Sequence, residues 1–371
     1  MRVFFYPQAR LRDRQLATVR AWPRADVVNF QQLSDNVGSQ VARKVALHRK
    51  VSIAWPQRIP LINVKRRPPG LAPEVAVYVW GALVATGPFI VDLDNPFALT
   101  GYNLRALYLY RPLLRAILAS RRCVAIRCMS RACVSSLEAL FGKTVSGKAT
   151  VCYPSAGLSA AAAGDVRVER DCRFLFVSTQ FEIKGGAALL RAFRAVLDQV
   201  PTARLDMVTH LPAEYEPLVQ ACSGAVQIHA AEFSREELAT RFMSVADVLV
   251  HPTYVDSFGM VALEALAAGL GLIVTDVYAL PELVTPDNGF VLPAPVSIWN
   301  GYLPSRDYYR LRDIKQRIHA TDTAAFERQL TTAMVRFATD PAFRHSARRA
   351  SADLFAQRFQ AEESPSCGSP S

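Results

Sequence analysis

The sequence predicts an α/β protein of two domains, each built around a parallel β-sheet. The chain has 371 residues, of which 51% are apolar and 20% charged. At roughly 100–200 residues per domain, this length corresponds to about two domains, and the composition is that of a globular protein rather than a disordered one. Short β-rich runs alternate with segments of helical length, which is the pattern of parallel strands connected by covering helices.

The first half of the chain begins this alternation. We expect strands at Val3–Tyr6, Asp26–Phe30, Val51–Trp55, Val75–Trp80, Phe89–Asp92 and Cys123–Cys128. We expect helices at Gln40–His48, Leu104–Ala119 and Arg131–Phe141, the last of which ends at Gly142. These elements predict a first domain over residues 1–155, and the Ala-rich segment Gly157–Gly164 is the expected linker.

The second half shows the same alternation more clearly. Strands are expected at Arg173–Ser178, Leu205–Thr209, Val226–His229, Val248–His251 and Leu272–Thr275, and helices at Ala187–Asp198, Arg235–Phe242, Met260–Ala268 and over residues 323–360. We therefore predict a second domain over residues 156–345. Residues 346–371 are expected to contain a last helix that packs back on the first domain, followed by a disordered tail.

The charge of the chain is unevenly distributed. Residues 1–155 contain 23 Lys/Arg against 7 Asp/Glu, whereas residues 156–371 contain 20 against 25. This asymmetry indicates an anionic partner for the first half, although an Arg-rich composition bias would give the same excess. No helix-turn-helix, zinc or aromatic RNA motif accompanies the positive charge, so we do not expect nucleic acid as a partner.

The segment Leu104–Arg122 mixes apolar residues and tyrosines with arginines, and it has two interpretations. It is either a face that contacts an anionic membrane surface or a domain helix with a solvated basic side. The basic loop Lys65-Arg66-Arg67 is likewise either near acceptor or lipid phosphates or simply solvated. No apolar stretch reaches the ~18–20 residues that a membrane span requires, so any membrane contact is expected to be peripheral.

The segment from Ala246 to Leu283 carries the clearest chemical pattern. A strand ends at His251, a polar loop follows, and Ser257-Phe258-Gly259 opens a helix. Unpaired amide groups and the helix dipole make such a helix start suited to a phosphate. Asp256 in the loop and Glu264 on the helix are carboxylates that can accept hydrogen bonds from sugar hydroxyls. The alternative is an ordinary βα unit with a capping Asp or Ser and a solvated Glu.

Two further polar segments follow predicted strands. Lys184 precedes Gly185-Gly186 and is a point charge beside a flexible turn, suited to a diphosphate, although many such loops are merely solvated. Asp92 and Asp94 follow a buried strand in the first half, where open α/β sheets place their ligands. For these two residues, acceptor binding or proton handling and a turn built by Asp-Asn-Pro remain open alternatives.

These motifs resemble the signature of the family 4 retaining glycosyltransferases, which have the GT-B fold. In the signature an acidic residue is followed by seven residues and a Glu, with Phe-Gly between them. Here it extends from Asp256 through Phe258-Gly259 to Glu264. The strand and loop from Phe176 to Gly186 resemble the family's segment ending in Lys-Gly. The chain has Asp where the family more often has Glu, and Ser178-Thr179 where the family usually has Gly-Arg.

The resemblance implies two Rossmann-like domains facing across a cleft, with the second binding a nucleotide sugar. It implies Asp256 on the donor sugar, Glu264 on the ribose and the Gly259/Met260 backbone on the diphosphate. The donor-binding set is then Thr179, Lys184, Gly185, Asp256, Ser257, Phe258, Gly259, Met260 and Glu264, and the catalytic set is Asp256, Lys184 and Asp94. It also implies transfer with retention and no metal or other cofactor.

We therefore expect a cytoplasmic enzyme, peripheral at the inner face of a membrane, that transfers a sugar to a hydroxyl of a glycan or glycolipid such as lipopolysaccharide or capsule. Two alternatives remain. One is a nucleotide-sugar epimerase of the same fold, for which the chain offers few additional acid/base residues. The other is a catalytically impaired relative that binds a nucleotide or a partner.

Overall fold

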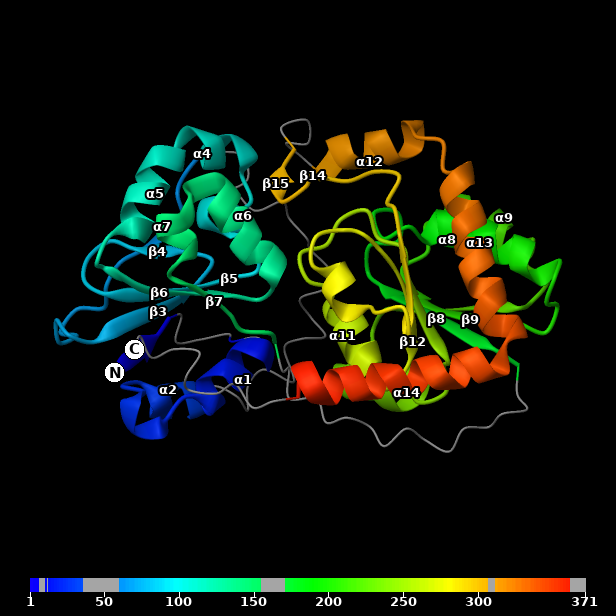
Figure 1. Cartoon of the computed structure of the whole chain (residues 1–371), viewed down its shortest axis with the longest axis horizontal. Helices are drawn as coiled ribbons and strands as arrows, with labels where there is room; N and C mark the ends of the chain where they lie inside the picture. The colour runs from blue at the N-terminus through cyan, green and yellow to red at the C-terminus, as the bar shows by residue number, and fades with distance from the viewer. Residues whose placement is uncertain (7–10, 12, 36–59, 155–170, 306–310, 361–371) are drawn as a thin grey trace. The chain divides into compact units, whose positions relative to one another are not determined.

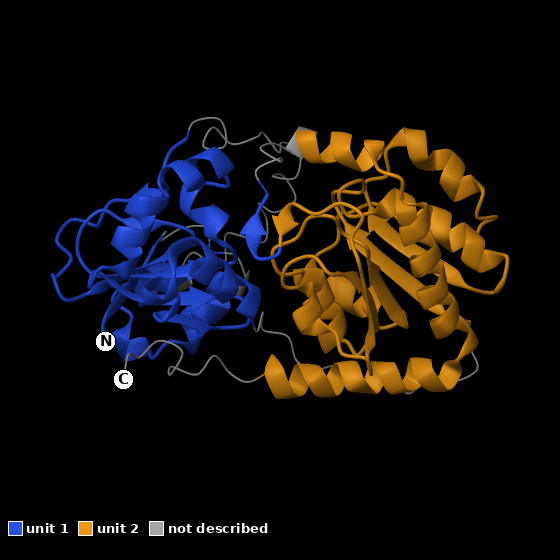
Figure 2. Cartoon of the chain, turned by 45° about the horizontal axis from the view of Figure 1, so that its top comes forward, with its two compact units in different colours: residues 1–157, 301–309, 361–371 blue, residues 158–300, 310–360 orange. Residues whose placement is uncertain are grey.

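The computed structural model describes residues 1–6, 11, 13–35, 60–154, 171–305 and 311–360 (Figure 1). The chain divides into two compact units (Figure 2). Unit 1 comprises residues 1–157, 301–309 and 361–371, and unit 2 comprises residues 158–300 and 310–360. The expected elements at Gln40–His48 and Val51–Trp55, the linker Gly157–Gly164 and the terminal tail lie outside the described residues. Within the described part, no helix combines the length and apolarity needed to cross a membrane.

Unit 1 is built on five parallel strands in the order β1-β3-β5-β6-β7. Its strands are β1 (Val3–Phe5), β2 (Val64–Lys65), β3 (Ala76–Trp80), β4 (Leu83–Val84), β5 (Phe89–Leu93), β6 (Cys123–Cys128), β7 (Ala149–Val151) and β15 (Leu303–Pro304). Its helices are α1 (Asp13–Ala21), η1 (Arg24–Asp26), α2 (Phe30–Asp35), η3 (Pro96–Thr100), α4 (Leu104–Leu109), α5 (Arg111–Ala119), α6 (Arg131–Phe141) and α7 (Lys143–Ser146). Apolar and aromatic runs that fill both faces of the sheet explain the central strands.

Two expectations for unit 1 were wrong. Residues 26–30 do not form a strand, because Val27 makes only an isolated bridge with Val3 and the side chain of Asn29 bonds to both backbone groups of Phe5. The expected helix Leu104–Ala119 is two helices, α4 and α5. The break precedes Pro112, which lacks a backbone N–H and is suited to the first turn of a new helix.

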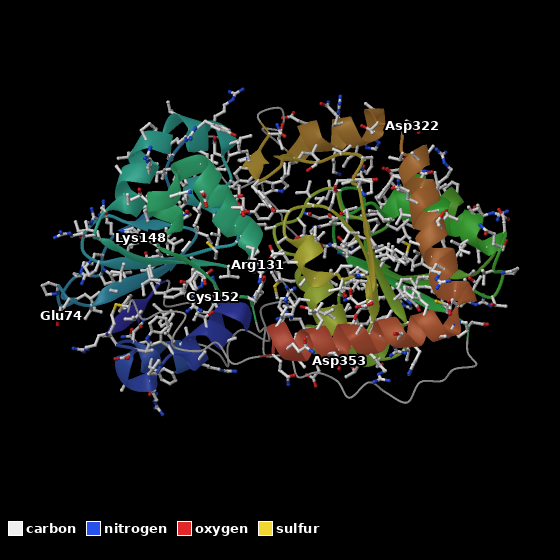
Figure 3. The ribbon with its side chains drawn as sticks, in the orientation of Figure 1. Glu74, Arg131, Lys148, Cys152, Asp322 and Asp353 are labelled. Carbon is white, nitrogen blue, oxygen red and sulfur yellow. The ribbon has the colours of Figure 1, made fainter. Side chains whose placement is uncertain are left out.

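Side-chain hydrogen bonds connect segments of unit 1 that are far apart in the sequence. The ammonium of Lys148, labelled in Figure 3, donates to the carbonyls of Ala119, Ser120 and Cys123, close to the end of α5. A late segment of the chain is held by two hydroxyls of this unit. Ser136 Oγ donates to the carbonyl of Tyr302 at 2.6 Å, and Tyr108 OH donates to that of Pro304 at 2.7 Å.

Unit 2 contains six parallel strands in the order β10-β9-β8-β11-β12-β13. The strands are β8 (Arg173–Ser178), β9 (Arg204–Thr209), β10 (Val226–His229), β11 (Val248–His251), β12 (Gly271–Thr275), β13 (Gly289–Leu292) and the short β14 (Trp299–Asn300). The helices are α8 (Gly186–Leu197), η4 (Ala213–Tyr215), α9 (Glu216–Gln220), α10 (Arg235–Glu237), η5 (Leu238–Met243), α11 (Met260–Ala267), η6 (Leu280–Leu283), α12 (Leu311–Ala320), α13 (Ala324–Thr339) and α14 (Pro341–Arg358). The five strands predicted for this half are confirmed, and Figure 1 shows α8 and α13 on one side of the sheet and α11 on the other.

The strand order of unit 2 reverses between β8 and β11. From β8 the chain proceeds outward to β9 and β10, whereas β11 lies on the opposite side of β8 and pairs with it in parallel. The loops that follow these two strands diverge at such a point, which is where open α/β sheets bind their ligands. Gly185 allows the two loops to approach closely. It has φ +77°, and a Cβ atom built on it would lie 2.1 Å from the carbonyl oxygen of Pro252.

Helix α14 packs within unit 2. The guanidinium of Arg348 donates to the carbonyl of Gly269 at 3.0 Å and to the buried carboxylate of Asp247 at 3.3 Å, and Ser351 donates to the carbonyl of Leu270. Its buried side chains are engaged with α11, α13 and β12, and the expected packing of the last helix on the first domain stays a prediction. A buried cation and a buried carboxylate that satisfy each other explain this position.

We expect Arg348→Met to lower the free energy of unfolding by about 3 kcal/mol, because it leaves the Asp247 carboxylate buried without its cation. The neighbouring Arg349 is exposed, so Arg349→Met is a matched control that should stay within about 0.5 kcal/mol of the parent. Urea denaturation of the three proteins measures the difference. Equal stabilities of the two variants would contradict the assigned role of Arg348.

We also expect Gly185→Ala to destabilise the protein more than Gly224→Ala does. Both glycines have positive φ, +77° and +76°, but no atom lies within 4 Å of a Cβ at Gly224. Gly224→Ala is the control, and it should lower the free energy of unfolding by about 1 kcal/mol through left-handed backbone strain alone. In Gly185→Ala the steric clash with Pro252 should lower it by about 1–3 kcal/mol more. Thermal unfolding midpoints of the two variants test this, and coincident midpoints would refute the close approach.

Candidate functional site

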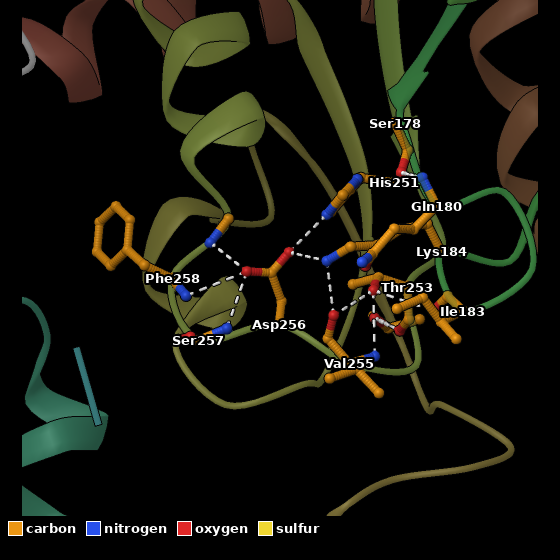
Figure 4. A network of polar contacts seen from close by, with 12 residues as sticks. Ser178, Gln180, Ile183, Lys184, His251, Thr253, Val255, Asp256, Ser257 and Phe258 are labelled. Carbon is orange, nitrogen blue, oxygen red and sulfur yellow. Dashed lines mark hydrogen bonds and ion pairs between the residues drawn. The ribbon is translucent and has the colours of Figure 1, made fainter. Parts of the chain in front are cut away.

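The polar centre of unit 2 lies where β8 and β11 end (Figure 4). Lys184, from the loop after β8, places its ammonium 2.7 Å from Asp256 Oδ2 and 2.6 Å from the carbonyl oxygen of Val255. Asp256 and Val255 belong to the loop after β11. The amide of Tyr254 also donates to the carbonyl of Ile183 at 3.0 Å. The structure thus brings together the two segments on which the sequence prediction rested.

The carboxylate of Asp256 accepts hydrogen bonds at both oxygens. Oδ1 receives the backbone N–H groups of Ser257 at 2.8 Å, Phe258 at 3.3 Å and Gly259 at 2.9 Å. Oδ2 receives Lys184 and the imidazole Nε2 of His251, which lies 3.0 Å away (Figure 4). The side chain of Asp256 is 16% exposed. This carboxylate therefore joins the β8 loop, the end of β11 and the start of α11.

The protonation states in this cluster follow from burial and charge. Burial alone would raise the pKa of the Asp256 carboxyl, but the Lys184 ammonium and the hydrogen bonds from His251 and Lys184 outweigh it and hold that pKa well below its usual range. Burial lowers the pKa of the His251 imidazole by more than Asp256 raises it. At neutral pH the cluster therefore contains an ionised Asp256 and a neutral His251.

His251 is the last residue of β11, as the sequence predicts. Its side chain is 2% exposed, and because the ionised Asp256 can only accept, Nε2 must carry the hydrogen. Nδ1 is buried and has no hydrogen-bond partner among the described residues. No local sequence signal marks this contact, because it depends on the turn that brings Asp256 back toward the strand.

The start of α11 is arranged as a partly occupied anion site. Gly259 is the residue before the helix and has φ +82°, a left-handed conformation that glycine adopts readily. The backbone N–H of Gly259 already donates a hydrogen bond to the carboxylate of Asp256. The amides of Met260 and Val261 make no hydrogen bond recorded for the described part of the chain. These two donors, together with the dipole of α11, are oriented for an anion.

Glu264 lies in the second turn of α11 and is paired with Arg235. The Nε of Arg235 is 2.6 Å from Glu264 Oε1, and the NH2 group contacts the same oxygen. Arg235 begins α10 behind a capping box formed by Ser234 and Glu237, a pattern that marks the helix start but gives no indication of the partner. Sequence reasoning therefore missed Arg235.

The remaining predicted positions of unit 2 differ in their surroundings. Thr179 is exposed, and Gly185 lies against Pro252. Glu182, between them, accepts from His319 Nε2 at 3.0 Å and from the ammonium of Lys315, both on α12. Burial raises the pKa of the Glu182 carboxyl, but these two partners lower it by more, so the group is ionised. Helix α12 is thereby attached to the same loop as Lys184.

Asp94 belongs to unit 1, unlike Lys184 and Asp256. Its Oδ2 accepts from Tyr102 OH at 3.1 Å, and its Oδ1 accepts from the amide of Asn95. Asn95 in turn caps η3 by accepting from the amide of Phe97, so the expected Asp-Asn-Pro turn is present. Asp92 is buried and accepts from Tyr78 OH at 2.7 Å. The predicted roles of both carboxylates stay predictions.

A metal site would need several ligands close together. Among the residues that the structure describes, no group of three or more His, Cys, Asp or Glu side chains has that arrangement. Six cysteines are described, and all of them are buried free thiols.

Comparison with known proteins gives a family match in unit 2. Residues 171–299 match the family described as glycosyl transferases group 1. The chain is 30% identical over 175 residues to a D-inositol 3-phosphate glycosyltransferase of Streptomyces avermitilis, covering 39% of this chain and 36% of the relative. It is 32% identical over 87 residues to the lipopolysaccharide glucosyltransferase WaaG of Escherichia coli K12, covering 23% of each. The matched segments thus span about a third or less of these relatives.

Two solved structures share the fold over nearly the whole chain. The Anabaena Alr3699/HepE structure with UDP and glucose superposes with a TM-score of 0.56 at 12% identity, covering 98% of this chain and 97% of that one. The structure of WaaG, a glycosyltransferase involved in lipopolysaccharide biosynthesis, gives a TM-score of 0.54 at 14% identity, covering 99% and 98%. Residues 171–299 are therefore a glycosyl transferases group 1 domain, in a chain that has the fold of the GT-B glycosyltransferases.

Proposed function

We propose that the chain is a glycosyltransferase whose unit 2 binds a nucleotide-sugar donor. The observation that carries the proposal is the convergence of Lys184, the Asp256 loop and the start of α11 at the reversal point of the parallel sheet. The whole cluster lies within the matched group 1 segment. The Anabaena Alr3699/HepE structure of similar fold contains UDP and glucose, which makes UDP the first nucleotide to examine.

The diphosphate would be held by groups that the structure leaves available. The Lys184 ammonium has three N–H groups, of which Val255 and Asp256 engage two. The amides of Met260 and Val261 add two donors at the positive end of α11. Charge that develops on the departing diphosphate would be stabilised by these fixed donors, so the proposed transfer requires no metal.

The carboxylate of Glu264 is proposed to bind the ribose of the donor. Carboxylate oxygens accept hydrogen bonds from vicinal hydroxyls, and Arg235 fixes the orientation of this carboxylate from one side. The guanidinium that the family usually has at position 179 is absent here, and the guanidinium of Arg235 lies beside Glu264, one of the predicted donor residues.

The acceptor is proposed to be a hydroxyl of a glycan or glycolipid bound by unit 1, with Asp94 as the candidate group near the acceptor. The excess of Lys and Arg in this half suits an acceptor with phosphate or acidic groups. Of the relatives compared above, one is a D-inositol 3-phosphate glycosyltransferase and the other is a lipopolysaccharide glucosyltransferase. We propose retention at the anomeric carbon from the resemblance of the Asp256–Glu264 signature.

An anionic membrane surface is the proposed additional partner. From Asn95 to Leu137 the sequence contains seven arginines and no acidic residue. On α4 and α5, Leu109 is 65% exposed and Leu113 is 49% exposed, and the exposed Arg105 and Arg115 lie on the same two helices. Exposed leucines among arginines are the composition of a surface that enters the interface of an anionic bilayer. We call the exposed side of these two helices, with these two leucines and two arginines, the α4–α5 surface.

The first prediction concerns the donor. Addition of UDP, GDP, ADP, CMP or their common sugar forms is expected to raise the melting temperature for one base. Glu264→Ala should weaken that binding about 10–100-fold, because it removes hydrogen bonds to a charged group. Isothermal titration calorimetry measures the affinity.

Glu216→Ala on α9 provides the matched control, because Glu216 is exposed and lies outside the proposed site. It should bind the nucleotide as the parent does. No response of the parent to any nucleotide would contradict the donor site. Binding without transfer or hydrolysis of any sugar form would instead favour the impaired relative, and interconversion of the sugar would favour an epimerase.

The second prediction concerns the α4–α5 surface. The double variant Leu109→Ser/Leu113→Ser should bind phosphatidylglycerol-containing vesicles at least about tenfold more weakly than the parent, because two apolar side chains no longer leave water. Leu61→Ser is the control, since Leu61 is 55% exposed in unit 1 and lies outside that surface. Vesicle sedimentation measures the binding, and equal binding by the double variant would refute the proposal.

A further inference from the structure

The hydrogen-bonding capacity of Asp256 is fully used within the protein. A carboxylate offers about four lone-pair positions. Asp256 receives five donors, three from the amides of residues 257–259 and two from the side chains of Lys184 and His251. A sugar hydroxyl could bind this carboxylate only by displacing one of them.

We propose that Asp256 is a positioning residue that holds Lys184 and the start of α11 in place and does not touch the donor sugar, and that His251 in turn holds Asp256. This inference rests on the proposed function, since it assigns a role within the donor site. It departs from the role that the resemblance to family 4 implies for this position.

Lys184 is the group through which Asp256 acts. A lysine side chain has a flexible four-carbon stem, and fixing its ammonium at one point costs conformational entropy. Asp256 Oδ2 and the Val255 carbonyl oxygen fix it from two sides, and the side chain is only 16% exposed. The remaining N–H group of the ammonium is therefore presented in a defined direction before a diphosphate arrives.

His251 is the last residue of β11, and its side chain is buried within unit 2. Its imidazole is 2% exposed, and Nδ1 is buried without a partner among the described residues. Such an unpaired buried atom is unfavourable, so the contribution of the imidazole must come from its other nitrogen. That nitrogen lies 3.0 Å from Asp256 Oδ2, whereas the amides of residues 257–259 bond to Oδ1, so the carboxylate is restrained at both oxygens.

The discriminating experiment compares a nucleoside diphosphate with its sugar form. UDP and UDP-glucose, with GDP and GDP-mannose in parallel, are titrated into the parent and Asp256→Asn at a temperature where both are folded by circular dichroism. A positioning role acts on the diphosphate, so the affinities for both members of the bound pair should fall together, by at least about tenfold. A role on the sugar would weaken only the sugar form.

Two further sets of variants separate positioning from a loss of folding. His251→Gln can place an amide N–H near the position of Nε2 and should restore most of the affinity that His251→Leu loses. In a double-mutant cycle, Asp256→Asn should cost little additional affinity once Lys184→Met has removed the group it positions. Neither result is expected from a residue that merely stabilises the fold.

The possible outcomes distinguish this inference from the proposed function. Parent protein that binds none of UDP, GDP, ADP, CMP and their sugar forms overturns the donor site itself. Parent protein that binds, combined with an Asp256→Asn loss confined to UDP-glucose or GDP-mannose, overturns the positioning role alone. Fully additive losses of Asp256→Asn and Lys184→Met would also overturn it, because residues that act through each other are not independent.

Discussion

The ionised carboxylate of Asp256 is the interaction on which the arrangement of unit 2's polar centre depends. A charge with so little exposure is stable only when it is paired, and its donors come from the β8 loop, the end of β11 and the start of α11. Each of these segments is positioned by a different strand or helix. A shift of any one of them is therefore resisted by the others through a single group.

The predictability of the fold differed between the two units for a physical reason. Five of the six strands in the sheet of unit 2 were predicted, all except β13, because parallel strands covered on both faces are continuous apolar runs that the sequence shows directly. Residues 26–30 have a similar run, but the side chain of Asn29 takes over the backbone groups of Phe5 that a strand would have used. Composition alone does not distinguish these two situations.

The candidate site was predictable to the extent that it is local. Lys184 and Asp256 lie in loops that follow strands, and spacing to a helix start identifies such positions. Arg235 contacts Glu264 across 29 residues, and Lys315 contacts Glu182 across 133, so these pairs depend on how strands are ordered in the sheet. The same holds for His251, whose function as a donor depends on the path of the loop after it.

The hydroxyl contacts that hold residues 302 and 304 in unit 1 have a consequence for biosynthesis. A ribosome releases the chain from its N-terminus, and domains generally fold as they emerge. Unit 1 contains residues 1–157 and 301–309, so its own contacts are completed only after residues 158–300 of unit 2 have been translated. Unit 1 consequently cannot complete its folding until much of unit 2 has been synthesised. A fragment that ends at residue 157 lacks residues 301–309 of unit 1.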